Sequence, residues 1–154
     1  MLAGLALRPL TEPDEGRNAE VAREMAASGD YVLPRLNGLP YVDKPALYYA
    51  VVAGSFELFG ASEWSARLPS VIATLLTALL IGGFARHLFG SMDAGIFAAG
   101  AMLAAPLTWI MSQIVILDAL FALWVVAALV AFYLAVEAAC VQDRERGRAA
   151  SLTA

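Results

Sequence analysis

Three long apolar stretches dominate the second half of this chain, at residues 68–85, 94–111 and 114–136. Each approaches the roughly 20 residues that an α-helix needs to cross the hydrocarbon core of a bilayer. Backbone polar groups in lipid must be satisfied within their own segment, so only helices can form such spans here. The sequence therefore predicts an all-α membrane protein with three complete transmembrane helices.

The composition agrees with this prediction. Of the 154 residues, 60% are hydrophobic and 16% are charged, whereas charged residues make up about 25% of an ordinary soluble domain. The formal net charge of −4 argues against a nucleic-acid partner, because nucleic acid requires a basic surface. Cys140 is the only cysteine, so the chain can form neither an internal disulfide nor a site with several thiolate metal ligands.

The stretches divide the chain into four predicted parts. Residues 1–10 are interpreted as the end of a truncated, partial first transmembrane helix, because no basic segment and no small-residue cleavage site mark a signal peptide there. Residues 11–66 form an outer catalytic loop, which is predicted to be periplasmic and to carry short amphipathic interfacial helices. Residues 67–140 hold the three transmembrane helices, and residues 141–154 form a cytoplasmic tail.

Two helices are predicted within the outer loop. The first covers residues 18–28 and ends at Gly29, because glycine readily adopts the left-handed conformation that terminates helices. The second covers residues 46–59, after Pro45 and before Gly60, since proline is tolerated where a helix begins. The first of them is only weakly apolar, which favours a place at the membrane surface over one across the bilayer.

Basic residues set the predicted orientation. Arg86 follows the first apolar stretch, and Arg144, Arg146 and Arg148 follow the third. By the positive-inside rule both places are cytoplasmic. The outer loop and the start of the third span then share the opposite side, where several charged residues are expected to converge on one site. These residues are Asp14, Glu15, Asp43, Lys44 and Asp118.

Asp118 is the strongest single anomaly. An ionisable residue inside an apolar stretch is by default a functional candidate. The alternative is an acid at a helix end that reaches water or pairs with Arg17 or Arg35. Together with Asp14 or Asp43, Asp118 has the oxygen ligands that a hard divalent cation prefers.

The loop offers two further pairs of candidates. Asp14 and Glu15 are adjacent, so only one is expected to face a given substrate atom, where a partly buried carboxylate suits a general base. The alternative is that both acids stabilise the start of the helix that follows. Lys44, near Tyr41, suits a phosphate at headgroup depth, whereas the alternative is a solvated surface pair with Asp43.

Four sequence strings stand out in and after the loop: Asp14-Glu15-Gly16-Arg17, Ser28-Gly29-Asp30-Tyr31, Tyr41-Val42-Asp43-Lys44-Pro45 and Trp64-Ser65-Ala66-Arg67-Leu68-Pro69. Together they resemble the first outer loop of the GT-C type, polyprenyl-phosphate-sugar-dependent glycosyltransferases. These are the bacterial relatives of the protein O-mannosyltransferases and of the aminoarabinose transferase that modifies lipid A. The resemblance covers residues 11–132 and corresponds to the N-terminal portion of a family whose members have many more membrane helices.

The resemblance implies an inverting membrane glycosyltransferase in the cytoplasmic (inner) membrane, with its active site on the periplasmic or outer side. It implies a polyprenyl-phosphate-sugar donor and a lipid or protein acceptor. The implied site residues are Asp14, with Glu15 beside it, as catalytic carboxylates and Lys44, next to Asp43, as the contact to the donor phosphate. Asp118 is implied to act through a divalent metal ion (Mg, Mn or Zn) or through the electrostatics of the site. We further predict that Arg17 binds the donor phosphate and that Asp43 and Tyr41 support the site.

The sequence departs from the family pattern at two places. Asn18 stands where members usually have an aromatic residue, and no arginine shortly precedes Asp118. Two other interpretations stay open. One is a small transporter or channel subunit that uses Asp118 as an ion site. The other is an inactive membrane fragment that needs a partner chain or a missing C-terminal part.

Overall fold

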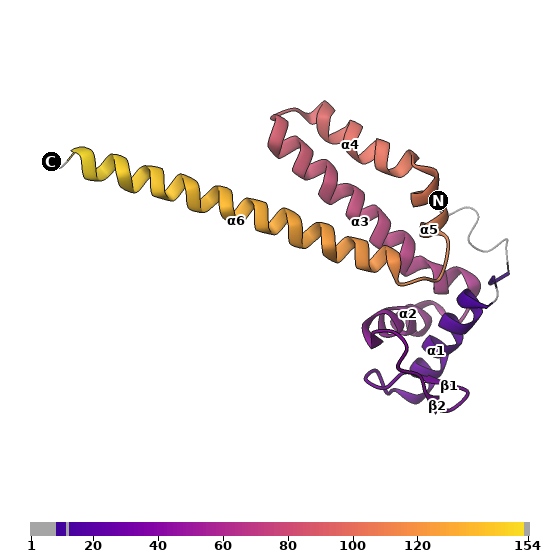
Figure 1. The fold of residues 1–154 in the computed structure, drawn as a ribbon. Helices are drawn as coiled ribbons and strands as arrows, with labels where there is room; N and C mark the ends of the chain where they lie inside the picture. The colour runs from indigo at the N-terminus through magenta and orange to yellow at the C-terminus, as the bar shows by residue number, and fades with distance from the viewer. Residues whose placement is uncertain (1–8, 12, 153–154) are drawn as a thin grey trace.

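The computed structural model describes residues 9–11 and 13–152. Within them the chain is mostly helical. Helices α3, α4 and α6 form a bundle, whereas α1, α2 and a short hairpin form a compact unit at one end of it (Figure 1). We call this unit the cap; it comprises residues 13–60. The predicted end of a truncated helix at residues 1–10 falls largely outside the described residues.

Helix α1 spans Asp14–Ser28, so it begins four residues earlier than predicted. Asp14 and Glu15 lie in its first turn, where acidic side chains interact favourably with the positive end of the helix dipole. The helix ends as predicted at Gly29, whose φ of 69° is left-handed and whose N–H donates to the carbonyl of Met25 at 3.0 Å.

A minimal β-hairpin, which was not predicted, follows α1. Strand β1, Arg35–Leu36, pairs antiparallel with β2, Leu39–Pro40. Asn37 and Gly38 form the turn with φ values of 54° and 77°, the left-handed pair that tight hairpin turns require. The Glu24 carboxylate of α1 accepts from their backbone N–H groups at 2.5 and 3.0 Å, which fastens the hairpin to the helix.

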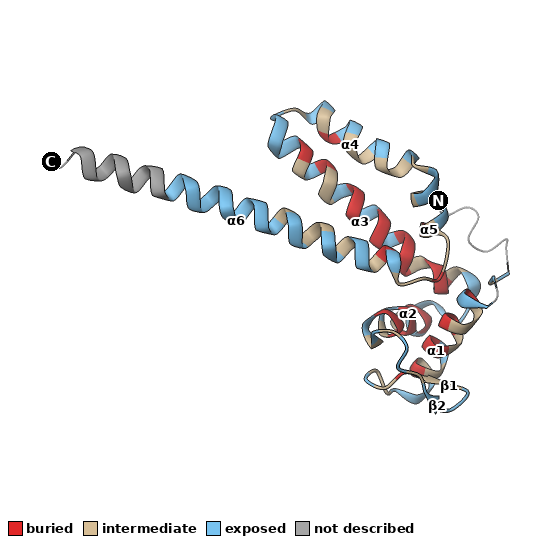
Figure 2. Ribbon diagram, viewed as in Figure 1, coloured by how far each residue is buried: buried red, intermediate tan, exposed pale blue. Residues whose placement is uncertain are grey.

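Helix α2 covers Ala46–Phe59, the predicted range. It packs against α1 through the buried side chains Tyr48, Tyr49, Val52 and Phe56. Burial in the molecule is concentrated between these two helices and along the inner side of α3 (Figure 2). Helices form at both places predicted within residues 11–66, while their amphipathic character and their position at the membrane surface stay predictions.

Helix α3 spans Glu63–Phe89 and is longer than the predicted 68–85. Ser62 and Ser65 form a reciprocal capping box at its start, with backbone N–H to hydroxyl distances of 3.2 and 3.0 Å. Pro69 lies inside the helix and has no N–H to offer to the carbonyl of Ser65. The hydroxyl of Ser55 on α2 donates to that carbonyl at 2.7 Å, so the proline also becomes a point of attachment for the cap.

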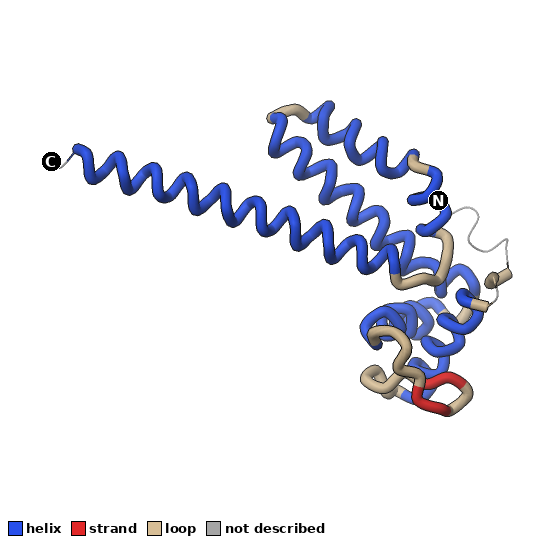
Figure 3. The backbone as a smooth tube through the Cα atoms, viewed as in Figure 1, coloured by secondary structure: helices blue, strands red, loops and turns tan. Residues whose placement is uncertain are grey.

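The second predicted span, 94–111, is broken. Helix α4 covers Met92–Ala104 and helix α5 covers Pro106–Ser112, and the two axes are bent by 68°. Pro106 explains the break, because its ring clashes with the preceding turn and it lacks a donor. Figure 3 shows the short loop that separates α4 from α5 and the longer one between α5 and α6.

The third predicted span, 114–136, also differs. Residues 113–117 are not helical, and α6 runs from Asp118 to Leu152. Asp118 is therefore the first residue of the helix and does not lie within it. Two described helices, α3 and α6, are long and apolar enough to cross a membrane, and the bent pair α4 and α5 makes a third span if it is taken as one unit. The chain is a multi-pass helical membrane protein.

Candidate functional site

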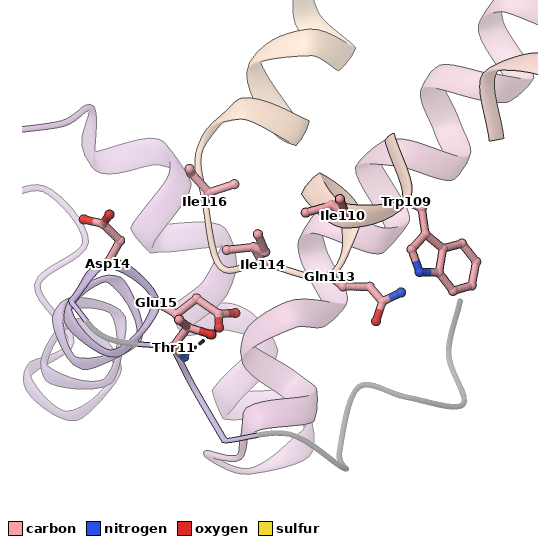
Figure 4. Close-up of a pocket in the computed structure, with 8 residues that line it drawn as sticks. All are labelled: Thr11, Asp14, Glu15, Trp109, Ile110, Gln113, Ile114 and Ile116. Carbon is pink, nitrogen blue, oxygen red and sulfur yellow. Dashed lines mark hydrogen bonds between the residues drawn. The ribbon is translucent and has the colours of Figure 1, made fainter. Parts of the chain in front are cut away.

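A pocket of about 400 Å³ lies where the cap meets the membrane helices. It extends from the start of α1, past the loop that leads into α6, to helix α5 (Figure 4). Its lining residues are Thr11, Asp14, Glu15, Trp109, Ile110, Gln113, Ile114 and Ile116. Segments about 100 positions apart in the sequence thus form one cavity.

Glu15 is the buried anchor of this region, with 1% of its surface exposed. Its Oε1 accepts from Arg67 Nε and from the Val115 N–H, both at 3.0 Å. Its Oε2 accepts from Arg67 Nη2 at 3.1 Å and from the Thr11 N–H at 2.8 Å. Arg67 is equally buried on α3. The carboxylate therefore joins α1, α3 and the loop before α6.

These contacts determine the ionisation of Glu15. Burial alone would raise its pKa, but the hydrogen bonds from the Arg67 guanidinium and from the Thr11 and Val115 N–H groups outweigh burial and lower the pKa below its ordinary value of 4.5. At neutral pH Glu15 is an ionised acceptor whose two oxygens are both occupied. This arrangement suits a residue that positions other groups, and it suits proton transfer poorly.

Asn18 reinforces the same attachment. Its Nδ2 donates to the carbonyl of Val115 at 2.8 Å, and the Tyr49 hydroxyl donates to its Oδ1 at 3.4 Å. Glu15 and Asn18 are one helical turn apart, so together they hold both backbone polar groups of Val115. We call Glu15, Asn18 and Arg67, with Val115, the clamp.

The clamp was not predicted. In the sequence Asn18 was noted only as a departure from the family pattern, and Arg67 only as part of a resembling string. A signal was nevertheless present. Arg67 is a charged residue at the edge of an apolar stretch, and Asn18 follows Glu15 by three positions, on the same face of a helix.

Asp14, unlike the buried Glu15, lies at the surface. Its side chain is exposed, contacts Arg17 and points away from Glu15 (Figure 4). The two adjacent side chains diverge as expected, with Asp14 exposed and Glu15 buried, while the prediction that only one of them faces a given substrate atom stays a prediction. The alternative, that both acids stabilise the start of the helix, also holds in part, because both lie in the first turn of α1.

The structure brings Arg17 close to the loop between the hairpin and α2. The Tyr41 hydroxyl donates to Asp43 Oδ2 at 3.2 Å, and the Tyr41 ring meets that of Tyr49 edge-on, with 6.4 Å between ring centroids. Burial and the neighbouring Asp43 raise the pKa of Tyr41, while Arg17 opposes the shift. Arg17, Tyr41 and Asp43 therefore form one polar group next to Asp14.

Lys44 is half-buried beside this group. Among the described residues it forms no hydrogen bond and no ion pair, so the predicted alternative of a solvated pair with Asp43 is not formed. Asp43 binds Tyr41 instead. An ammonium group without a carboxylate partner in this part of the chain suits an anionic ligand.

Asp118 lines a different cavity, of about 210 Å³, between α3, α4, α5 and α6. Its polar neighbours there are threonines, among them Thr74 and Thr77. Asp118 is exposed at the first position of α6, which agrees with the alternative of an acid at a helix end that reaches water. The alternative pairing with Arg17 or Arg35 is not found, since these residues pair with Asp14 and Asp30. The structure brings together four of the predicted site residues, namely Asp14, Arg17, Tyr41 and Asp43, but it does not place Asp118 in the pocket that Asp14 lines.

A divalent metal ion does not fit the donors present. Among the residues that the structure describes, no three His, Cys, Asp or Glu side chains come together as a ligand group. Asp118 is the only carboxylate that lines its pocket within the described residues. The metal ion stays a prediction, and no step of the mechanism proposed below depends on it.

The fold and the pocket define a class: a helical multi-pass membrane protein with a charged cap on one end of its bundle. The chain belongs to the dolichyl-phosphate-mannose-protein mannosyltransferase family, whose model matches residues 43–144. This membership favours the glycosyltransferase interpretation over the transporter alternative.

Individual relatives agree with this family membership. The chain is 40% identical over 133 residues to the undecaprenyl phosphate-alpha-4-amino-4-deoxy-L-arabinose arabinosyl transferase of Aeromonas salmonicida, covering 86% of this chain and 24% of that protein. It is 36% identical over 140 residues to the transferase of the same name from Edwardsiella ictaluri, covering 91% of this chain and 25% of the relative. The chain thus spans about a quarter of the length of the curated relatives it matches.

Two solved structures are also similar to this chain. The crystal structures of ArnT from Cupriavidus metallidurans, in the apo state and bound to undecaprenyl phosphate, match with a TM-score of 0.80 and 40% sequence identity. The match covers 84% of this chain and 24% of the ArnT chain.

Proposed function

We propose that this chain forms the donor-binding and catalytic part of a membrane glycosyltransferase. The reaction transfers a sugar from a polyprenyl-phosphate-linked donor to a lipid or protein acceptor. The proposal rests on one observation: a chain that is 40% identical, over 84% of its length, to a protein crystallised with undecaprenyl phosphate has a pocket lined by the exposed carboxylate of Asp14.

The proposed reaction is a single displacement with inversion. Asp14 orients the acceptor hydroxyl and takes its proton as the acceptor oxygen bonds to the anomeric carbon. The bond between that carbon and the phosphate oxygen breaks, and the polyprenyl phosphate leaves with the electron pair. Lys44 and Arg17 stabilise the negative charge on the departing phosphate.

Glu15 takes no part in this proton transfer. We propose that it acts as a positioning residue through the clamp. With Arg67 and Asn18 it fixes the loop around Val115, and the neighbouring Ile114 and Ile116 form part of the pocket wall. A wall held at both backbone groups of Val115 keeps the cavity open beside Asp14.

The proposed location is the cytoplasmic (inner) membrane, with the cap on the periplasmic or outer side. Support comes from Arg86 and His87, which lie in the last turn of α3 at the end of that helix away from the cap (Figure 1). Basic residues at this end favour a cytoplasmic position for it.

A chimeric enzyme tests the function. This chain replaces the matched quarter of the Aeromonas salmonicida transferase, and membranes are assayed for release of undecaprenyl phosphate from undecaprenyl phosphate-4-amino-4-deoxy-L-arabinose, with lipid A as acceptor. We expect transfer, and we expect Asp14→Asn to reduce it by about 10²- to 10⁴-fold, the usual contribution of a general base.

The matched control is Glu20→Gln, which removes an exposed carboxylate of the same helix that pairs with Arg23 and does not line the pocket. It is expected to retain transfer. Wild-type rates in the Asp14→Asn chimera, at equal amounts of inserted protein, would remove Asp14 from the mechanism.

A further inference from the structure

The bend at Ala105 directs helix α5 toward the cap. Helix α4 ends at Ala104, the chain turns by 68°, and α5 is followed by the non-helical residues 113–117. Irregular backbone in a membrane span is tolerated only where it is buried in protein or lines a cavity. Here α5 supplies two of the residues that line the pocket, and the non-helical residues after it supply three more, so the broken segment lines a cavity.

Trp109 on α5 and Gln113, the residue directly after that helix, both end in groups that need partners. Trp109 is 47% exposed and Gln113 is half-buried, and both line the pocket at the end opposite Asp14 (Figure 4). They are four positions apart, which places them on one side of the helix. Among the described residues, neither the indole N–H nor the Gln113 amide forms a hydrogen bond, although the backbone N–H of Gln113 is bound by the carbonyl of Ile110 at 3.1 Å.

These groups match the chemistry of a pyranose ring. Such a ring has apolar C–H faces and hydroxyl groups around its edge. An indole offers a flat apolar surface with one donor, and a carboxamide can both donate to and accept from neighbouring hydroxyls. A pocket of about 400 Å³ lies within the usual range of about 300–1,000 Å³ for ligand sites.

We propose that Trp109 and Gln113 form a sugar-binding subsite in which a pyranose ring packs on the indole and hydrogen-bonds to the amide. The proposal rests on the proposed function and goes beyond it by naming the residues that recognise a sugar. The ring belongs either to the donor or to a glycosylated acceptor, and the experiment separates the two.

Kinetics of the chimera give the first test. Trp109→Ala and Gln113→Ala are each compared with Trp124→Ala, a matched control whose indole is 58% exposed on α6 and does not line this pocket. We expect each pocket variant to raise the KM of one substrate about five- to tenfold, with kcat changed less than about twofold, and Trp109→Phe to recover most of the loss.

The substrate whose KM rises identifies the source of the ring. A rise for the polyprenyl-phosphate sugar assigns the subsite to the donor, and a rise for the acceptor assigns it to the acceptor. Unchanged KM values for both substrates in an active chimera would overturn the subsite. So would an equal change in Trp124→Ala.

A binding experiment does not depend on turnover. In the full chain, Trp64→Phe and Trp124→Phe leave Trp109 as the only tryptophan, and its quenching by iodide is measured in nanodiscs with and without methyl α-D-mannopyranoside or 4-amino-4-deoxy-L-arabinose. Protection by either sugar, and none by the open-chain mannitol, supports the subsite even if the chimera is inactive, in which case the proposed function alone fails. Equal quenching with and without both sugars would overturn the subsite.

Discussion

A buried ion pair is the residue-scale feature on which the site depends. Glu15 and Arg67 are each about 1% exposed, and burying both charges carries a desolvation penalty. Here the penalty is offset by hydrogen bonds that saturate the carboxylate from two backbone N–H groups as well as from the guanidinium. Removing one partner of such a pair costs about 3–5 kcal/mol, because a charge is left buried without compensation.

The lowered pKa of Glu15 gives a pH prediction. A carboxyl whose pKa is lower in the folded state stabilises the fold above its unfolded pKa, near 4.5, and this contribution is lost as the pH falls through the folded value. We therefore expect the free energy of unfolding in detergent to decrease as the pH falls below about 4.5. Denaturant titrations at successive pH values measure it.

The control for this prediction is Glu15→Gln. It is expected to be less stable at neutral pH and to lose less stability on acidification, since the amide does not titrate. An acid-induced loss as steep as that of the wild type would show that other carboxyls, such as Glu20 and Asp30, whose pKa values are also lowered, account for it.

Sequence alone predicted part of this residue-scale arrangement. The divergence of Asp14 and Glu15 follows from helical geometry and needed no fold. The clamp could not be predicted in the same way, because Glu15 meets Arg67 across 52 positions and Val115 across 100. Pairings at such separation depend on how helices pack, and no local pattern encodes them.

At the scale of elements, a glycine crossing holds α3 against α4. A Cβ added to Gly82 would lie 2.9 Å from the carbonyl oxygen of Gly95, and one added to Gly95 would lie 2.7 Å from that of Gly82. Backbone atoms cannot move aside as a side chain can. The two helices approach this closely because neither has a side chain at the crossing.

This geometry predicts that Gly82→Ala destabilises the helix pair, whereas Gly83→Ala does not. The neighbouring Gly83 has no atom within 4 Å of an added Cβ. We expect the first variant to lower the unfolding temperature by several degrees, consistent with about 1–3 kcal/mol for overpacking, and the second to leave it unchanged or raise it. Thermal unfolding in detergent compares them, and equal effects would contradict the crossing.

The boundaries of the elements were predicted unevenly, for physical reasons. Helix α2 has its predicted bounds because Pro45 and Gly60 mark both ends. The hairpin was missed because its strands have two residues each, although Asn37-Gly38 is a turn signal. The bend at Ala105 and the unwound residues 113–117 were missed because hydropathy measures apolarity and does not distinguish a continuous helix from a broken one.

At the scale of the whole molecule, the orientation in the membrane can be tested with single cysteines. In a Cys140→Ser background, Val42→Cys places a thiol on the cap and Phe89→Cys places one at the far end of α3, at positions that are 77% and 74% exposed. We expect a membrane-impermeant maleimide to label the first in intact spheroplasts and the second only after permeabilisation, because basic residues favour the cytoplasmic side. Labelling of both thiols from one side would refute this orientation.

The fold class was predictable because long apolar stretches leave few alternatives in lipid. The prediction of three complete spans holds in part: α3 and α6 qualify by themselves, and α4 with α5 qualifies only as a bent pair. The four predicted sections of the chain and the roles of the site residues stay predictions. In the structure α6 packs little: 6% of the residues in its apolar segment are buried, compared with 33% in that of α3.

The clamp also bears on how the protein is made. The core between α1 and α2 can assemble from the first 60 residues, but the partner of Glu15 and Asn18 is Val115, which leaves the ribosome much later. With the proposed orientation, the cap would therefore reach the outer side of the membrane before the segment that contains Val115 has been inserted. The order of translation thus makes completion of the pocket one of the last steps in the biogenesis of this part of the protein.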